Sequence, residues 1–226
     1  MLDLQNAHHL SLTMQVELKL KQALISARLA PGERLNTRDI ADNMHISITP
    51  VREALLRLVA EGALCVAPAQ AFTVPCITRA QFDEIALIRH QLEPLALAHF
   101  LRQPRDDVAQ VLMQLSRLNE EFNHAWQQRD VCQTLKLQRH FRFTLYKASA
   151  LPLLYTMIEQ LWVRTGPCFH FLHTTPVLLK GHQHGYDDLL KALDRNDAAM
   201  AAQELAKALT QSTELAMRHH FDMSEE

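Results

Sequence analysis

Apolar residues recur at intervals of three and four along most of the chain, and this spacing places them on one face of an α-helix. Near the N-terminus Leu12, Val16, Leu20 and Leu24 keep the interval, and Ser11 precedes them as a candidate N-cap. We therefore predict a first helix that starts after Ser11 and ends before the turn at residues 31–32. Residues 1–10 carry no such pattern, and we expect them to form a frayed arm.

Two more helices are predicted between residues 36 and 64. The first covers residues 37–44, where Ile40, Ala41 and Met44 share one face. Residues 45–47 form the turn, and we predict that Thr49 caps the second helix with Pro50 as its first residue. The second helix then buries the apolar residues Val51, Leu55, Leu58 and Val59. This leaves its N-terminal end exposed.

Two short strands are predicted after the third helix. Residues 62–66 end the helix and begin the first strand, and residues 72–74 form the second before Pro75. Residues 68–71 would make the turn between them. Three helices followed by a hairpin predict a winged helix-turn-helix domain over residues 1–75.

Residues 76–226 show helical periodicity throughout. Thr78 and Gln81 have the spacing of a capping box, so a helix is expected to start at Thr78. The helices predicted from the pattern cover about 79–101, 105–128, 131–149, 152–165, 176–194 and 197–220. Because the polar connections are short, we expect an all-α antiparallel bundle. The predicted fold is therefore mostly α, with a winged helix followed by a helical bundle.

Composition and charge narrow the possible functions. The chain has 226 residues, 48% of them hydrophobic, and a net charge of −2. Seven Lys and Arg balance seven Asp and Glu up to residue 77, so nucleic-acid binding would need clustered cations and not a diffuse basic field. The four cysteines are far apart and are interpreted as reduced core thiols. No apolar run reaches 18 residues, and we expect a cytoplasmic protein.

The segment around the two central helices resembles the DNA-binding domain of GntR-type bacterial transcription regulators. The matching residues are Pro31-Gly32, Leu35, Ile40-Ala41, Ser47 and the run TPVREAL at residues 49–55. The segment IRHQLEPLALAHF at residues 88–100 resembles the start of the FCD domain, the helical effector-binding half of the FadR branch. The pair Arg89 and Glu93 matches the R-x-x-x-E of that domain. Together the two resemblances cover nearly the whole chain.

This resemblance implies a DNA-binding surface at the start of the second helix of the motif. The family's contacts fall on Arg38, Ser47, Ile48, Thr49 and Arg52, and we add Arg34 and, in the turn of the hairpin, Gln70. Arginine can bind guanine or phosphate, whereas Ile48 stands where the family often has arginine. The alternative for Arg52 is a salt bridge within the domain. The turn Pro68-Ala69-Gln70-Ala71 lacks the usual glycine and basic residues.

The resemblance also implies where a metal would lie. Many FCD domains bind a divalent cation through Asp or Asn, a His four residues later, and two further His. Those positions carry Gln138, Arg142 and Tyr186, and the fourth falls at or near Ala208. Because none of them is a good ligand, we expect no metal cofactor. A replacement site among the histidines stays open as an alternative; the candidates are His170, His173, His182 and His184.

An arginine in place of the metal could receive an anion. We therefore expect a homodimer whose bundle binds a small anionic or polar effector through Arg89, Gln138, Arg142, Tyr146, Arg164 and Tyr186. The alternative is that these arginines pair with Glu93 and Glu159. Repression is the expected mode of regulation of a double-stranded operator. A helical interaction module and a metal-dependent enzyme are the other candidates, but no enzyme motif is present.

Overall fold

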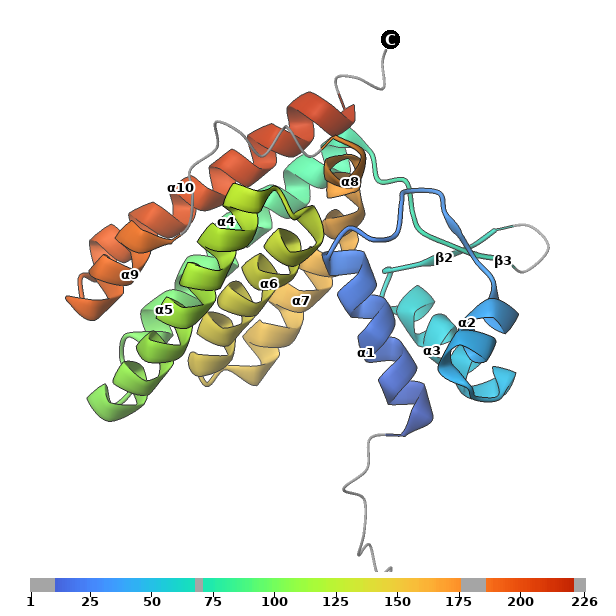
Figure 1. Ribbon diagram of the computed structural model, residues 1–226, viewed down its shortest axis with the longest axis horizontal. Helices are drawn as coiled ribbons and strands as arrows, with labels where there is room; N and C mark the ends of the chain where they lie inside the picture. The colour runs from blue at the N-terminus through green and yellow to red at the C-terminus, as the bar shows by residue number, and fades with distance from the viewer. Residues whose placement is uncertain (1–10, 68–70, 176–185, 222–226) are drawn as a thin grey trace, which may run out of the picture.

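The computed structural model describes residues 11–67, 71–175 and 186–221. Figure 1 shows a small unit built from α2, α3 and the short strands on one side, and a bundle of longer helices on the other. Helix α1 (Leu12–Ile25) lies between them and packs against both α3 and α7. The arm expected at residues 1–10 lies outside the described residues.

The first three helices follow the predicted pattern. Ser11 caps α1, because its hydroxyl accepts a hydrogen bond from the backbone N–H of Met14 at 3.2 Å. Helix α2 (Thr37–Met44) has the predicted bounds, and α3 covers Ile48–Ala60. Val16 and Leu24 of α1 pack in one core with the inner face of α3. Burying each apolar side chain of this size stabilises the domain by about 1.5–3 kcal/mol.

The predicted start of α3 is wrong by two residues. Ser47 is the N-cap, with an extended backbone, and the helix begins at Ile48, so Thr49 and Pro50 lie inside its first turn. Proline is compatible with that turn because the first N–H groups of a helix have no acceptor within the helix. His45 closes the preceding turn in the left-handed conformation, with φ of 55°.

Three short strands form the wing. Strand β1 (Arg34–Leu35) pairs with β3 (Ala71–Thr73), which also pairs with β2 (Cys65–Ala67), and both pairings are antiparallel. Phe72 lies opposite both Leu35 and Val66 in this register. The hairpin was predicted, but β1 was not, because a two-residue strand leaves no periodic signal. Most of the turn, including Gln70, lies outside the described residues.

The bundle comprises α4 (Arg79–Phe100), α5 (Arg105–Gln128), α6 (Val131–Ala148), α7 (Pro152–Thr165), α9 (Asp187–Asp194) and α10 (Ala198–Ala216). A 3₁₀ turn, η2 (Gly166–Phe169), and the short α8 (Phe171–Thr174) follow α7. Thr78 and Gln81 form the predicted capping box. The helix expected from residue 176 begins at Asp187, and residues 176–185 lie outside the described part. The last helix ends in a π turn, η4 (Met217–Phe221).

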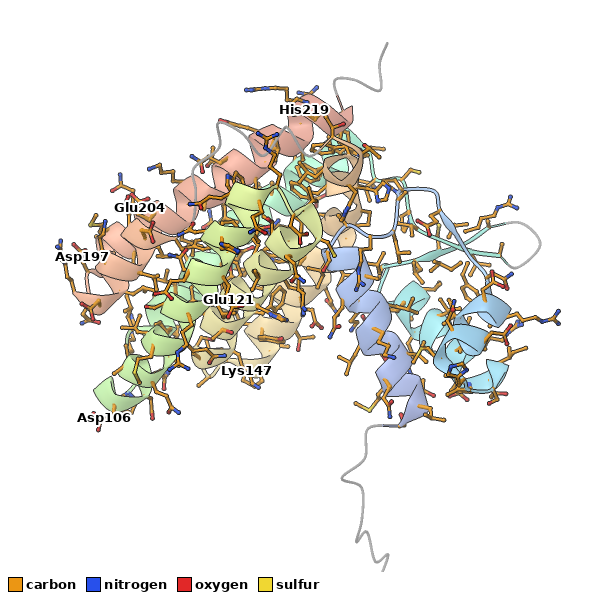
Figure 2. All side chains as sticks on the ribbon, viewed as in Figure 1. Asp106, Glu121, Lys147, Asp197, Glu204 and His219 are labelled. Carbon is orange, nitrogen blue, oxygen red and sulfur yellow. The ribbon has the colours of Figure 1, made fainter. Side chains whose placement is uncertain are left out.

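The bundle is layered around one apolar core. Helix α5 packs along α6, α4 along α7 and α10, and α10 along α9. Figure 2 marks Asp106, Lys147 and Asp197 at the end of the bundle far from the winged helix. Each is exposed, as expected for charged residues near helix ends. The core therefore extends from these ends toward α1.

The cysteines depart from the sequence-based interpretation. All four are free thiols, but only Cys168 is buried, while Cys65, Cys76 and Cys132 are exposed. Burial raises the pKa of the Cys168 thiol to about 12. The interpretation as core thiols is therefore correct for Cys168 and wrong for the other three cysteines. None of the helices in the described part is both long and apolar enough to cross a membrane.

Candidate DNA-binding surface and bundle cavity

The N-terminal end of α3 is presented to solvent. Val51, Leu55 and Leu58 are fully buried and fix the inner face of the helix. On the outer face Ser47, Ile48, Thr49 and Arg52 are all exposed, and Ile48 keeps 45% of its surface. The Ser47 side chain makes no capping hydrogen bond to α3. The end of the helix therefore offers backbone N–H groups and two hydroxyl side chains to an anionic ligand.

Arginines from neighbouring elements flank this end of α3. Arg34 of β1 and Arg38 of α2 line a shallow surface depression together with Ile48 and Ala71. Asn36, which lies between them, caps α2 by accepting a hydrogen bond from the Arg38 backbone N–H at 2.9 Å. Two turns of chain thus bring Arg34, Arg38 and the start of α3 to one face. Of the three arginines predicted to cluster, Arg34 and Arg38 lie together in this depression.

A buried polar network lies at the centre of the bundle. Glu93 of α4 is fully buried, and its Oε1 accepts hydrogen bonds from Arg89 Nε at 2.7 Å and Trp162 Nε1 at 2.9 Å. Its Oε2 accepts a hydrogen bond from the Tyr146 hydroxyl and lies 3.8 Å from Arg142 Nη1. The Arg89 guanidinium also lies over the Trp162 ring, 4.4 Å from its centroid. Three helices therefore meet at one carboxylate.

The charges of this network are set by their mutual contacts. Burial alone would raise the pKa of Glu93, but the neighbouring guanidinium groups of Arg89 and Arg142 outweigh it and lower the pKa below its ordinary value. Burial raises the pKa of Tyr146, which remains a neutral donor. Both arginines are thereby partnered by Glu93. The alternative left open by the sequence, pairing with Glu93, describes this part of the structure.

A cavity of about 80 Å³ lies beside the network, between α5, α6, α9 and α10. Phe122 and Trp126 of α5 and Phe169 of η2 contribute aromatic walls, and Tyr186 closes the side that faces Arg142. The Tyr186 ring stacks on Phe141 at 4.0 Å and lies 5.3 Å from the Arg142 guanidinium. Polar lining comes from Thr134, Gln138, Asp188, Glu204, Gln211 and Ser212.

The six residues predicted to bind an effector fall into three surroundings. Gln138 and Tyr186 line the cavity, whereas Arg89, Arg142 and Tyr146 belong to the network around Glu93. Arg164 lies elsewhere, against the winged helix. The sequence analysis missed the aromatic walls and Trp162, because their apolar spacing is that of ordinary core residues. An aromatic i, i+4 pair, Phe122 and Trp126, was the available signal.

The positions at which the family holds a metal come together, but they do not suit a cation. Gln138, Tyr186 and Ala208 line the cavity, and Arg142 lies directly behind Tyr186. A buried guanidinium repels a metal ion, and an alanine offers no side-chain ligand. No group of three metal-ligating side chains occurs within the described ranges. His182 and His184 lie outside them.

Histidines 170 and 173 bind the end of α1 instead. His170 Nδ1 lies 2.7 Å from the carbonyl oxygen of Ala27, and His173 Nε2 lies 3.2 Å from that of Ser26. Because a carbonyl can only accept, each ring donates its N–H. These contacts join the segment after α7 to the C-terminus of α1.

Ion pairs, a hydrogen bond and a close backbone contact connect the winged helix and α1 to the bundle. Lys21 of α1 lies 2.8 Å from Glu61 at the end of α3 and 3.7 Å from Glu159 of α7. Arg164 Nη2 donates to the Glu61 carbonyl oxygen at 2.8 Å. A Cβ atom at Gly166 would lie 2.2 Å from the Leu24 carbonyl oxygen, so only glycine allows this approach. Helix α1 therefore contacts the bundle and α3 at once.

A winged helix with an exposed recognition helix, joined to a bundle with an internal cavity, defines the class of two-domain DNA-binding regulators. Residues 12–74 match the family model described as "Bacterial regulatory proteins, gntR family", and residues 84–222 match the FCD domain. The chain belongs to the GntR family of bacterial transcription regulators and carries an FCD domain.

Individual relatives agree with this assignment. The chain is 44% identical over 208 residues to the HTH-type transcriptional regulator McbR of Escherichia coli (strain K12), which covers 90% of this chain and 92% of the relative. The solved structure of E. coli McbR/YncC matches with a TM-score of 0.86 at 42% identity, over 93% of this chain and 99% of that chain. A GntR regulator from Rhodococcus sp. RHA1 shares the fold, with a TM-score of 0.68 at 18% identity, over 93% and 99%.

Proposed function

We propose that this regulator is a cytoplasmic homodimer that represses transcription by occupying a pseudo-palindromic operator and that a small effector in the bundle cavity controls its affinity. The observation that carries the proposal is the exposure of Ser47, Ile48, Thr49 and Arg52 on a helix whose opposite face is buried. In a helix-turn-helix this end of the second helix enters the major groove. No enzymatic role is proposed.

Each exposed side chain has a role that its chemistry supports. Arg52 can donate two hydrogen bonds to the edge of a guanine, and Ile48 can contact a thymine methyl group. Ser47 and Thr49 lie at the helix N-terminus, where hydroxyl and backbone N–H groups bind phosphate. Arg34 and Arg38 flank this end and are assigned to the DNA backbone. Base contacts would thus come from α3 and positioning contacts from its neighbours.

A dimer is supported by an apolar surface on the bundle. Leu87, Ile88 and Leu95 of α4 are exposed, and Leu87 keeps 66% of its surface. On α7, which packs against α4, Leu153 and Met157 are also exposed. Large apolar side chains gathered on two adjacent helices are typical of interfaces. A two-fold pairing through these side chains would place two winged-helix domains, one from each subunit, on one DNA duplex.

The route from cavity to DNA passes through α1. A second cavity of about 30 Å³ shares Leu135, Gln138 and Phe169 with the larger one and reaches Ile25 of α1 and Gly166. A ligand that moves these shared side chains would act on the tight contact between Gly166 and α1. Because α1 also packs on α3, a shift of α1 would change the relative placement of the two winged-helix domains of the dimer.

Selection of bound sequences from random DNA by the full chain tests the proposal. The expected result is a short site with two-fold symmetry, bound at least about 10³-fold more tightly than random DNA at physiological salt. A footprint of this site should overlap a promoter that the protein represses in a reporter strain. Failure to enrich any sequence, or enrichment of an asymmetric site bound by one subunit, would contradict the proposal.

A further inference from the structure

The lining of the larger cavity indicates the charge of its ligand. Two carboxylates, Asp188 and Glu204, line it, and among the described lining residues there is no lysine, arginine or histidine. We propose that the effector is a small organic cation, a primary amine with a compact apolar body. The inference deepens the proposed function, because it rests on this cavity being the effector site.

The two carboxylates differ in exposure, because the Asp188 side chain is 44% exposed and the Glu204 side chain is mostly covered. Asp188 accepts a hydrogen bond from Lys191 at 2.9 Å, and Glu204 lies 3.6 Å from Lys207. The lysine side chains are 60% and 48% exposed and do not line the cavity, whereas the Glu204 side chain is only 15% exposed. Such solvent-facing pairs are weak. Glu204 therefore offers the cavity a negative charge that its lysine neutralises only in part.

An unpartnered hydroxyl lies in the same cavity. Thr134 is 2% exposed, and its Oγ1 has no hydrogen-bond partner within the described part of the protein. A buried polar group left in this state costs about 1–3 kcal/mol, so a ligand that bonds to it recovers this free energy. Ser212 already donates to the Ala208 carbonyl at 2.9 Å, which leaves its oxygen able to accept. Two hydroxyl oxygens can thus accept hydrogen bonds from an ammonium group.

The walls and the size of the cavity define the rest of the ligand. Phe122, Trp126, Phe169 and Tyr186 supply aromatic faces or edges, and the face of an aromatic ring attracts a cation. The volume of about 80 Å³ is well below the roughly 150 Å³ of an apolar cavity that takes benzene. An aliphatic amine of two or three carbons is the appropriate size.

Within the described part of the protein, no cationic side chain lines the larger cavity. Arg89 and Arg142 share the single negative charge of Glu93, the Tyr186 ring stands between Arg142 and the larger cavity, and Arg89 lines only the smaller adjoining one. Arg164 binds the end of α3. In the larger cavity the anionic effector expected from the sequence would therefore lie beside two carboxylates that are only partly compensated by exposed lysines, and burying a charge without a partner is unfavourable.

Three probes of matched size test the charge directly: propylamine, propan-1-ol and propanoate, titrated calorimetrically into the full chain at neutral pH. The amine is expected to bind about 5- to 30-fold more tightly than the alcohol, since one partly exposed ion pair and one cation–π contact each contribute roughly 0.5–1 kcal/mol. The carboxylate is expected to bind most weakly.

Substitutions in the cavity test which side chain causes the preference for the amine. Glu204→Gln should remove the preference for the amine and leave the alcohol within about twofold, and Thr134→Val should weaken both probes. Glu214→Gln, an exposed change on the same helix, should alter neither. The variants' melting curves establish that each is folded. Equal or tighter binding of the carboxylate, an unchanged amine preference in Glu204→Gln, or no binding by any probe would overturn the inference. Sequence selection by the same protein without probe tests the proposed function separately.

Discussion

Arginines of the winged helix and arginines of the bundle are chemically identical but lie in opposite surroundings. Arg34, Arg38 and Arg52 are exposed around the start of α3. Arg89 and Arg142 are buried against the carboxylate of Glu93. An exposed guanidinium can bind an external phosphate or base, whereas a buried and neutralised one holds helices together. The comparison teaches that burial, not the residue type, decides which arginines are accessible to a ligand.

The largest loss of stability is expected when Glu93, the partner of the two buried arginines, loses its charge. Glu93→Gln leaves Arg89 and Arg142 buried without a counter-charge and should lower the free energy of unfolding by about 3–5 kcal/mol. Both tryptophans, Trp126 and Trp162, lie in the bundle, so their fluorescence during urea denaturation reports its unfolding. Glu84→Gln, on the exposed face of the same helix, should change it by less than about 0.5 kcal/mol. A loss of stability for Glu93→Gln as small as that of the control would contradict a structural role for the buried arginines.

Acid should weaken the same network. Burial alone would raise the pKa of Glu93, but the positive charges of Arg89 and Arg142 outweigh it and hold the pKa below the ordinary value of 4.5. The folded protein therefore binds this proton less readily than the unfolded chain, so the stabilisation is complete above the unfolded pKa and is lost as the pH falls through the folded value. The stability difference between wild type and Glu93→Gln should be constant above about pH 5.5 and narrow below 4.5. A difference independent of pH down to 3 would rule out ionised Glu93.

A smaller effect is expected at an exposed arginine that grips the DNA backbone. Arg38→Ala should weaken binding to every DNA sequence by a similar factor and reduce the slope of log K against log salt by about 1 for each phosphate that the side chain neutralises. Fluorescence anisotropy at several salt concentrations measures both quantities. The stability of the protein should not change. A weakening confined to one DNA sequence would instead assign Arg38 to base recognition.

Arg164 is the intermediate case, and its replacement should lower the stability by much less than Glu93→Gln does. The residue is exposed but donates to the Glu61 carbonyl oxygen. Arg164→Ala should therefore cost about 0.5–1 kcal/mol in thermal unfolding. Arg117→Ala, an exposed arginine of α5, serves as the control. If Arg164→Ala is as damaging as Glu93→Gln, exposure does not separate the two classes.

Local rules predicted the elements well. The cap of Ser11 on α1, the bounds of α2 and the capping box at Thr78 follow from side chains that act on their own helix. The start of α3 was misplaced because Thr49 and Ser47 are both suitable caps, and a proline fits anywhere in the first turn. Local rules therefore leave an uncertainty of one or two residues at such an end.

The candidate site was predicted less well, because it depends on contacts between distant segments. Arg89 and Glu93 are four residues apart and were matched to the R-x-x-x-E pair of the family, but Trp162, which also donates to the Glu93 carboxylate, is 69 positions from Glu93. Arg164 carries the same side chain as Arg142, and only tertiary packing directs it to α3. The exposed end of α3 could be predicted, since the burial of its other face is periodic.

Base-pair discrimination by Arg52 tests the central claim most directly. The affinities of wild type and Arg52→Ala are measured for the selected operator and for versions in which each base pair of a half-site is replaced in turn, with Arg57→Ala, on the same helix, as the control. The account predicts that Arg52→Ala loses about 1–3 kcal/mol of discrimination at a single G·C pair per half-site and keeps it elsewhere. Discrimination retained by Arg52→Ala at every position would contradict recognition by the start of α3.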